Sequence, residues 1–246
     1  MESDDRQLGR LLTRREALRL MGVTGAALLA ACGPEAIGTT APTATSAPVG
    51  TNALPTCVVR PELTEGPYYV DEELNRSDVR SDPGSGVVRQ GALLALTFSL
   101  SQIANASCTP LAGARVEIWH CDAEGVYSDV SDPGFNTQGQ KFLRGYQVTD
   151  ANGLARFITI YPGWYRGRTV HIHFKVHPSA TQVFTSQLFF DDELSDQVFT
   201  QAPYAGRGQR NTLNGNDRIF NEQLLLNVTP ADEGYAAAFD IGMQMD

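Results

Sequence analysis

The chain has 246 residues, of which 42% are hydrophobic, and it is long enough to bury the core of one domain of ordinary size. Its formal charge at pH 7 is −9, from 19 basic and 28 acidic side chains. Proteins that bind nucleic acid present a basic face, so this balance argues against nucleic acid as a partner.

The N-terminal residues have the composition of an export signal. Arg14-Arg15 precedes an apolar run over residues 20–31, which is shorter than the about 20 residues of a membrane-spanning helix. The run ends in Leu29-Ala30-Ala31-Cys32, which resembles a bacterial lipobox. We therefore expect residues 1–31 to be a twin-arginine and lipoprotein signal peptide. Lipid on Cys32 would then hold an exported protein to the bacterial membrane, with an uncleaved membrane anchor as the alternative.

Residues 32–54 are rich in Ala, Thr, Pro, Gly and Ser, and Glu35 is the only charged residue among them. Such a segment buries too little apolar surface to fold, so we interpret it as a flexible tether. The folded domain is expected to occupy residues 55–246.

The sequence contains four cysteines: Cys32, Cys57, Cys108 and Cys121. If Cys32 carries lipid, an oxidising compartment favours one disulfide and one free thiol among the other three. The sequence leaves open which two of them pair. No Cys-x-x-Cys spacing indicates a zinc site.

From residue 90 onward, short β-prone runs alternate with turn residues. Strands are expected over residues 92–100, 114–120 (half-buried), 145–149, 155–160, 171–176 and 182–190, with further runs at 224–228 and 236–242. Residues 150–153 form a turn signal, and residues 191–200 have helical character. This order predicts an all-β domain, an antiparallel β-sandwich with short helices and long loops.

The run from Tyr165 to His173 contains side chains suited to a metal site. His171 and His173 lie two residues apart on an expected strand, so both project from the same face. Imidazole binds iron, copper, zinc and nickel. This spacing also occurs in ordinary strands, but here it follows Tyr165 and Arg168, and the chain has four histidines in all.

Several separate motifs, in the expected order, closely resemble those of the intradiol ring-cleavage dioxygenases. They are Glu65-Gly66-Pro67-Tyr68-Tyr69, the run 119–128, Phe142-Leu143-Arg144-Gly145, the run 161–165, Arg168, His171-Ile172-His173 and Gln187. The resemblance covers residues 55–240. Protocatechuate dioxygenase chains look nearer than catechol dioxygenases, because no long helical segment precedes the expected strands.

The resemblance implies a mononuclear non-haem Fe(III) ion held by Tyr127, Tyr165, His171 and His173. Phenolate is a hard, anionic oxygen donor that favours the ferric state. Further implied roles are proton acceptance by Tyr165, stabilisation of negative charge on the ring by Arg168 rather than Arg166, and orientation of substrate or a ligand by Gln187. Tyr68 is expected to line the substrate pocket, while His120 is expected to be structural and His177 an exposed turn residue.

The implied reaction opens a catechol-type ring between its two hydroxylated carbons. Both atoms of O2 enter the product, a muconate-type diacid. The sequence does not identify the catechol, and it is compatible both with a homo-oligomer and with a chain that acts alone.

Two other interpretations remain open. A transthyretin-like sandwich that only binds a ligand shares the patterns at Gly113, Asp150 and Pro162, but it has no need of Tyr127 or Arg168. A cupin-like metal oxygenase also uses His-x-His on a sandwich. It needs a further carboxylate and a distant histidine, and neither His120 nor His177 is well placed to serve.

Overall fold

The computed structural model describes residues 58–104 and 107–245. The expected signal peptide (1–31), the tether (32–54), Cys32 and Cys57 lie outside the described residues. Within the described part of the chain, none of the helices has the length and apolar character needed to cross a membrane.

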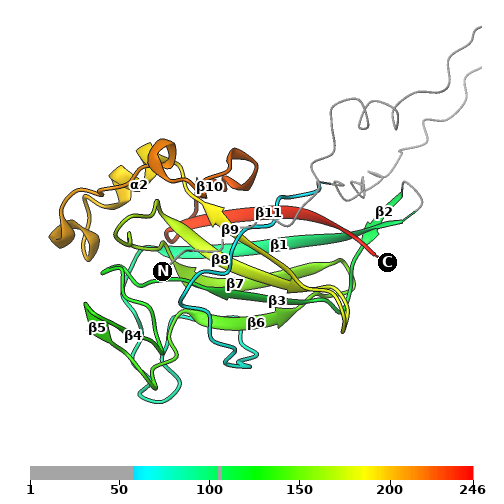
Figure 1. The fold of residues 1–246 in the computed structure, drawn as a ribbon, viewed down its shortest axis with the longest axis horizontal. Coiled ribbons are helices and arrows are strands. Elements are labelled where there is room, and N and C mark those ends of the chain that lie inside the picture. The colour runs from blue at the N-terminus through cyan, green and yellow to red at the C-terminus, as the bar shows by residue number, and fades with distance from the viewer. Residues whose placement is uncertain (1–57, 105–106, 246) are drawn as a thin grey trace, which may run out of the picture. The chain divides into compact units, whose positions relative to one another are not determined.

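Two β-sheets enclose the hydrophobic core (Figure 1). The five-stranded sheet has the order β10-β11-β1-β2, and β7 also pairs with β1. Its strands are β10 (Asn227–Pro230), β11 (Tyr235–Gln244), β1 (Leu93–Ala104), β2 (Ser107–Pro110) and β7 (Leu154–Ile160). The four-stranded sheet has the order β6-β3-β8-β9, formed by β6 (Arg144–Val148), β3 (Arg115–Trp119), β8 (His171–His177) and β9 (Phe184–Phe189).

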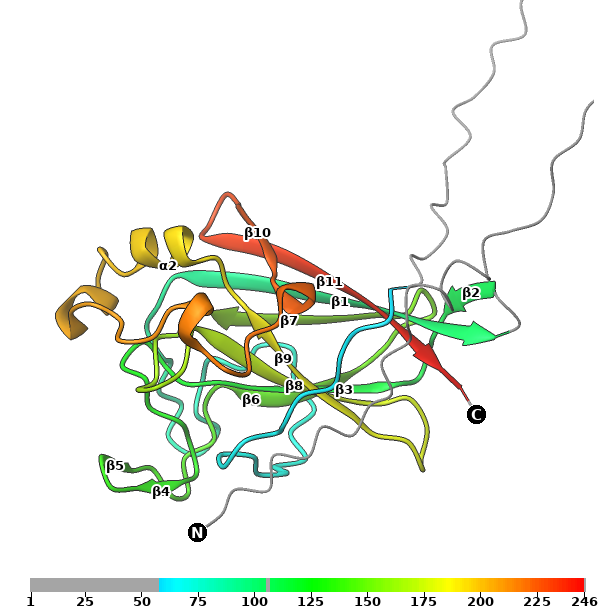
Figure 2. The ribbon, with the colours of Figure 1, turned by 45° about the horizontal axis from the view of Figure 1, so that its top comes forward.

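The remaining elements are short. A hairpin of β4 (Ser131–Asp132) and β5 (Phe135–Asn136) projects away from both sheets (Figure 2). Helix α2 (Asp192–Val198) is followed by the 3₁₀ helices η1 (Tyr204–Arg207), η2 (Asn214–Asn216) and η3 (Glu222–Leu224). The predicted fold class, an all-β sandwich with short helices and long loops, is confirmed.

The expected strands are present, with three corrections. β1 and β11 pair in parallel, from Leu94 opposite Tyr235 onward, so the five-stranded sheet is mixed rather than purely antiparallel. β3 is buried on both faces instead of half-buried, because residues further toward the N-terminus cover its outer side. The run expected at 224–228 is a strand only from Asn227, where β10 begins, because Leu224 ends the 3₁₀ helix η3. The predicted turn over residues 150–153 is present, and it joins β6 of one sheet to β7 of the other.

The core is formed by side chains that alternate along the strands. In β1, Leu94, Leu96, Phe98 and Leu100 are buried, and the residues between Leu94 and Leu100 that point the other way are half-buried. The ring of Phe98 packs against that of Phe174 in the opposite sheet, with ring centroids 5.3 Å apart. Burial of each such side chain contributes about 1.5–3 kcal/mol, so these contacts hold the two sheets together.

β8 is buried on both faces, and this arrangement creates the site. Ile172, Phe174 and Val176 face the core, whereas His171, His173 and Lys175 lie on the outer face of the four-stranded sheet. Residues 63–76, which we call the strap, cover this outer face. The strap begins where the Leu63 N–H donates to the Thr185 carbonyl (2.9 Å) and ends where the Arg76 N–H donates to the Tyr146 carbonyl (3.1 Å).

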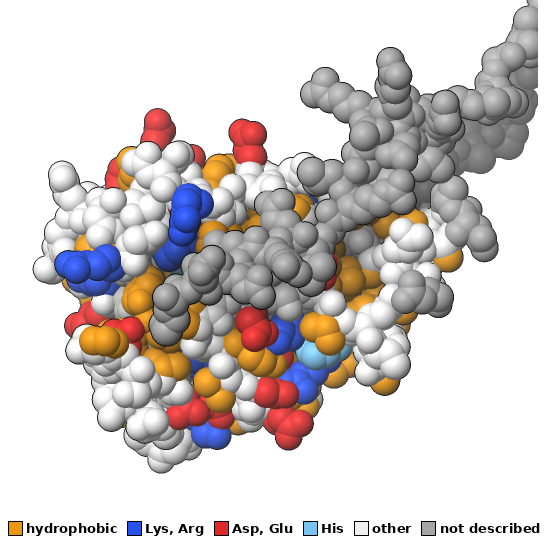
Figure 3. Space-filling view, viewed as in Figure 1, with side chains coloured by type: hydrophobic (Ala, Val, Ile, Leu, Met, Phe, Trp, Pro, Cys, Tyr) orange, Lys and Arg blue, Asp and Glu red, His pale blue; other side chains and the backbone are white. Residues whose placement is uncertain are grey.

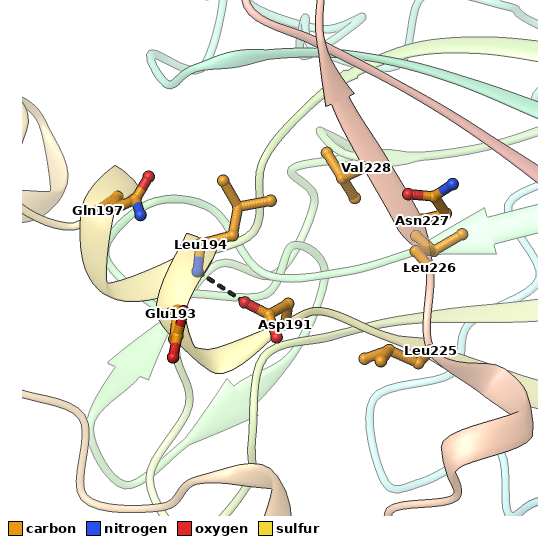
Figure 4. Close-up of a pocket in the computed structure, with 8 residues that line it drawn as sticks. All are labelled: Asp191, Glu193, Leu194, Gln197, Leu225, Leu226, Asn227 and Val228. Carbon is orange, nitrogen blue, oxygen red and sulfur yellow. Dashed lines mark hydrogen bonds between the residues drawn. The ribbon is translucent and has the colours of Figure 1, made fainter.

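Helix α2 confirms the expected helical character near residues 191–200. Asp191 caps it by accepting a hydrogen bond from the Leu194 N–H at 2.9 Å (Figure 4). A surface groove of about 430 Å³ lies between α2 and residues 225–228, and none of the predicted site residues lines it. The predicted chemistry therefore lies elsewhere in the fold.

Two described cysteines agree with the expectation of one disulfide and one free thiol. Cys108 is disulfide-bonded, and Cys121 is a buried free thiol that donates to the Gly163 carbonyl at 3.5 Å. On the described part of the face in Figure 3, acidic and basic side chains are interspersed rather than gathered into a basic patch.

Candidate metal centre

Four buried polar side chains form one row across the outer face of the four-stranded sheet. The strand register places Arg144 opposite Trp119, Trp119 opposite His173, and His173 opposite Gln187. Residues directly opposite one another project from the same face of a sheet. Because each comes from a different strand, four distant parts of the sequence meet in this row.

Three of the predicted ligand side chains bring their donor atoms together. The Nε2 atom of His171 lies 3.0 Å from Nε2 of His173 and 3.2 Å from Oη of Tyr127. Ligand atoms about 2.1 Å from one ion, and at right angles around it, are about 3 Å apart. The spacing of these three donors therefore fits a single metal ion.

The protonation of both histidines also suits a metal. Nδ1 of His171 donates to the Thr169 carbonyl at 2.7 Å, which leaves the lone pair on Nε2. Burial lowers the pKa of His171 to about 3, helped by the positive charge of Arg168. Burial likewise holds the pKa of His173 well below its usual value, and its buried Nδ1 has no hydrogen-bonding partner among the described residues. Neutral imidazoles are the form that binds metals.

Tyr165 lies beside Tyr127, at the edge of this group. Its ring is edge-on to Tyr127, with centroids 6.1 Å apart, and its Oη is hydrogen-bonded to Oη of Tyr68. The Tyr68 hydroxyl donates its one proton to Asp132 Oδ2 at 2.6 Å, so it accepts from Tyr165. The three side chains form a hydrogen-bonded chain that ends at the half-buried carboxylate of Asp132.

Arg168 and Gln187 are in direct contact, as a shared role would require. Nη2 of Arg168 donates to Oε1 of Gln187 at 2.6 Å, and Nε2 of Gln187 donates to the Thr64 carbonyl at 2.8 Å. Arg166, which the motif offset disfavoured, is exposed on the loop before β8. The guanidinium of Arg168 is thus held beside the histidines by the strap and by β9.

The ring of His173 is confined on both sides. Trp119 stacks on one face, with centroids 5.0 Å apart and an interplanar angle of 9°. Gly66 of the strap, at a φ of +76°, packs so closely that a Cβ atom there would lie 3.1 Å from Cε1 of His173. A side chain at this position would therefore press on the imidazole.

The other two histidines differ in how well they match expectation. His120 is structural, as expected: its ring nitrogens bond the Cys121 carbonyl (2.8 Å) and the Thr159 hydroxyl (2.7 Å). His177 is not an exposed turn residue. It ends β8, half-buried, with Nε2 4.0 Å from the Glu117 carboxylate, because the strand continues one residue further than expected.

Four residues of the site were missed by sequence reasoning: Trp119, Asp132, Arg144 and Asp217. Trp119 and Arg144 lie within motifs that were noted, but only the strand register places them beside His173. Asp132 lies in the two-residue strand β4 and Asp217 in the loop after η2, and neither carried a sequence signal. Within residues 58–104 and 107–245, no three His, Cys, Asp or Glu side chains form a metal-binding group, and the oxygen atom beside His171 Nε2 is that of the Tyr127 hydroxyl.

Comparisons with known proteins agree with the geometry. A sequence model of the family described as "Dioxygenase" matches residues 64–244. An intradiol ring-cleavage dioxygenase from Tetranychus urticae is 31% identical and superposes with a TM-score of 0.68, over 76% of this chain and 95% of that one. The chain belongs to the intradiol ring-cleavage dioxygenases.

Curated relatives of this intradiol dioxygenase include enzymes named for different substrates. Catechol 1,2-dioxygenase 2 of Acinetobacter lwoffii is 30% identical over 54% of this chain and 52% of its own length. The protocatechuate 3,4-dioxygenase beta chain of Burkholderia cepacia is 27% identical over 71% of this chain and 74% of its own. The chain thus spans about half the length of the catechol dioxygenases it matches and more of the protocatechuate chain, at similar identity.

Proposed function

We propose that this protein is a non-haem ferric dioxygenase that opens a catechol-type ring between its two hydroxylated carbons. Both atoms of O2 would enter the product, a muconate-type diacid. The observation that carries the proposal is the convergence of Tyr127, His171 and His173 beside Arg168, in a chain that belongs to this family.

Iron would be held by His171 Nε2, His173 Nε2 and Tyr127 Oη, with Tyr165 as the fourth ligand. The donor set suits Fe(III), because phenolate oxygen favours the ferric state and both imidazoles are neutral. A bound ferric ion would supply Lewis acidity, which would withdraw electron density from a catechol and make its ring reactive toward O2. His171, His173 and Tyr127 are almost fully buried, so bulk water is excluded from the point where they meet.

Tyr165 would accept a proton from the substrate, and Tyr68 and Asp132 would stabilise the protonated Tyr165 through hydrogen bonds. Loss of both hydroxyl protons from a bound catechol requires two acceptors: a hydroxide in the site would accept one and become water, and Tyr165 Oη would accept the other. Once protonated, that hydroxyl donates to Tyr68, which in turn donates to Asp132. This chain would stabilise the protonated Tyr165 hydroxyl and link it to the half-buried carboxylate of Asp132.

Arg168 would stabilise negative charge on the substrate ring. Its guanidinium is fixed by Gln187, and a fixed positive charge in a site that excludes water acts strongly on charge that develops during the reaction. The chemistry of the site thus supports ring cleavage rather than the transthyretin-like binding module, which has no use for these residues.

The test combines colour with oxygen uptake. The purified iron-loaded protein should be burgundy to red from phenolate-to-ferric charge transfer, and catechol or protocatechuate should drive O2 consumption. With ¹⁸O2, mass spectrometry should find both labelled atoms in a ring-opened diacid. Tyr165→Phe should weaken the colour and sharply reduce turnover, whereas Tyr146→Phe, on the edge strand β6, should do neither. A colourless protein that contains stoichiometric iron would contradict the ligand assignment.

We further propose that the protein is exported and lipid-anchored through Cys32, on the basis of the twin-arginine and lipobox patterns alone. The full-length protein should fractionate with membranes and partition into detergent. Cys32→Ala should abolish lipid attachment, detected by mass spectrometry of the mature N-terminus. An unmodified Cys32 in the membrane-bound protein would overturn this proposal.

A further inference from the structure

Asp217 is a buried carboxylate that lies just after η2, outside every motif noted in the sequence. Its Oδ2 accepts hydrogen bonds from Arg168 Nε at 2.8 Å and from the Thr169 N–H at 2.9 Å. Its Oδ1 accepts from the Ile219 N–H at 2.8 Å. Burial alone would raise the pKa of Asp217, but Arg168 and these N–H groups lower it below its ordinary value, so the group is ionised.

The loop that carries Asp217 is itself fixed to helix α2. Two hydrogen bonds hold Asn214 in place. Its backbone N–H donates to Asp192 Oδ2 at 3.0 Å, and its Nδ2 donates to the Phe190 carbonyl at 2.8 Å. Arg210, almost wholly buried, bridges Asp192 (2.6 Å) and Asp196 (2.8 Å). Asp217 is therefore presented from a rigid support.

The guanidinium of Arg168 is held at two of its three nitrogens. Nε bonds Asp217 and Nη2 bonds Gln187, while Nη1 donates to no described residue. A guanidinium is planar with donors in a fixed fork, so two bonds set the direction of the third nitrogen. Without Asp217, the long Arg168 side chain would rotate about its single remaining contact.

The carboxylate of Asp217 is also connected to His171, through hydrogen bonds to the backbone of Thr169. Thr169, whose N–H donates to Asp217, also donates its hydroxyl to Asn214 Oδ1 at 2.6 Å. The carbonyl of Thr169 then accepts the Nδ1 proton of His171. The loop after α2 thus anchors both the arginine and the backbone that selects the His171 tautomer.

We propose that Asp217 is a positioning residue for the ring-cleavage reaction, which aims the Nη1 side of Arg168 at the substrate ring. This inference rests on the proposed function. Asp217 does not touch substrate: it acts through Arg168, and its loss should be felt in the reaction more than in substrate binding.

A double-mutant cycle tests it, with Asp217→Ala, Arg168→Ala and the double variant in the iron-loaded protein. Displacement of a catalytic group by about 1 Å can cost about a hundredfold in rate, so Asp217→Ala should lower kcat by about tenfold to a hundredfold. The Kd for catechol without O2, from the visible spectrum, should change by less than about threefold, since charge on the ring develops only in the reaction. In the Arg168→Ala background, loss of Asp217 should cost almost nothing further.

Asp150→Ala is the matched control. Asp150 also accepts two backbone N–H bonds and one from an arginine, but it does so at the turn between β6 and β7. The Asp150→Ala variant should leave kcat unchanged. Asp217→Asn keeps one acceptor oxygen for Arg168 and carries the cycle if Asp217→Ala does not fold.

The outcomes separate the two proposals. A wild-type protein with iron but no oxygen uptake on any catechol would overturn the proposed function. An active wild type whose Asp217 variants keep full kcat, or lose as much in the Arg168→Ala background as alone, would overturn the positioning role. Loss of bound iron in Asp217→Asn with kcat per iron unchanged would do the same.

Discussion

At the scale of single residues, the imidazole of His173 illustrates how little freedom the site has. Trp119 stacks on one face of the ring, Gly66 packs close to its Cε1 atom, and the rings of His171 and Tyr127 lie beside it. The strap residue must be glycine for two reasons, its positive φ and the absence of space for a Cβ atom. These two reasons can be separated by experiment.

Gly66→Ala should destabilise the protein and disturb iron binding. A positive φ costs an alanine about 1–2 kcal/mol, and its Cβ would push on His173 Cε1. Gly86→Ala is the control, because Gly86 has a similar φ of +72° with nothing within 4 Å of its Cβ position. Both variants should lower the free energy of unfolding measured in urea, but only Gly66→Ala should lower bound iron. Equal iron content in the two would show that His173 yields to the added methyl.

The residues found from sequence and those missed differ in a physical respect. Tyr127, Arg168, His171 and Gln187 sit in local motifs whose spacing is itself informative. Asp217 contacts Arg168 only because the loop after α2 folds back on the start of β8. The residues around Asp217 and those around Arg168 contain no motif that indicates this contact. A carboxylate in a loop is otherwise typical of a solvated surface.

At the scale of elements, the strap is held to the sheet by Lys175. This buried lysine places Nζ 2.7 Å from Glu65 Oε2 and 3.4 Å from the ring centroid of Tyr69. Both partners belong to the strap, which also carries Gly66 and Tyr68. Lys175 is thus the contact that joins β8 to the segment covering the histidines.

Lys175→Met should loosen the strap while leaving the two sheets intact. Loss of a partly desolvated cation–π contact costs about 1–2 kcal/mol, so amide hydrogen exchange over residues 64–70 should accelerate about tenfold. Glu65→Gln removes only the ion pair, whose carboxylate is 48% exposed, and should cost less than about 1 kcal/mol. Exchange that is unchanged in Lys175→Met would show that other contacts hold the strap.

Strand positions could be predicted from sequence more readily than strand partners. Alternation of apolar residues identifies which face of β1 is buried, but the same pattern suits a parallel or an antiparallel neighbour. The parallel pairing of β1 with β11 was therefore missed. The hairpin of β4 and β5 was missed because each strand has only two residues, too few to show any period.

At the scale of the whole molecule, three buried neutral histidines should make the iron-free protein sensitive to acid. The pKa of His120 is lowered to about 4 and that of His171 to about 3, both chiefly by burial, and that of His173 is also lowered. Below pH 6.5 the unfolded chain takes up protons that the folded chain does not. Stability should therefore fall as pH drops from 6.5 toward 4, by up to about 1.4 kcal/mol per pH unit for each histidine.

Glu117 opposes this trend and provides the check. Burial raises its pKa to about 7, so the folded protein keeps a proton that the unfolded chain releases near its ordinary value, 4.5. Its contribution is present at low pH and is lost as pH rises through 7. Glu117→Gln should raise the urea midpoint at pH 8 relative to wild type and steepen the loss between pH 6.5 and 5. A wild-type midpoint that stays flat from pH 7 to pH 5 would contradict the histidine argument.

The parallel pairing of β1 with β11 also has a consequence for how the protein is made. Residue 94 finds its neighbour only at residue 235, so a ribosome must complete every strand between them before that side of β1 is covered. Until then, the backbone along one edge of β1 lacks its partner strand, and contacts so distant along the chain form slowly. The histidine strand can thus be synthesised long before the sandwich that buries it closes. This topology therefore favours a five-stranded sheet that is completed only after most of the chain has been synthesised.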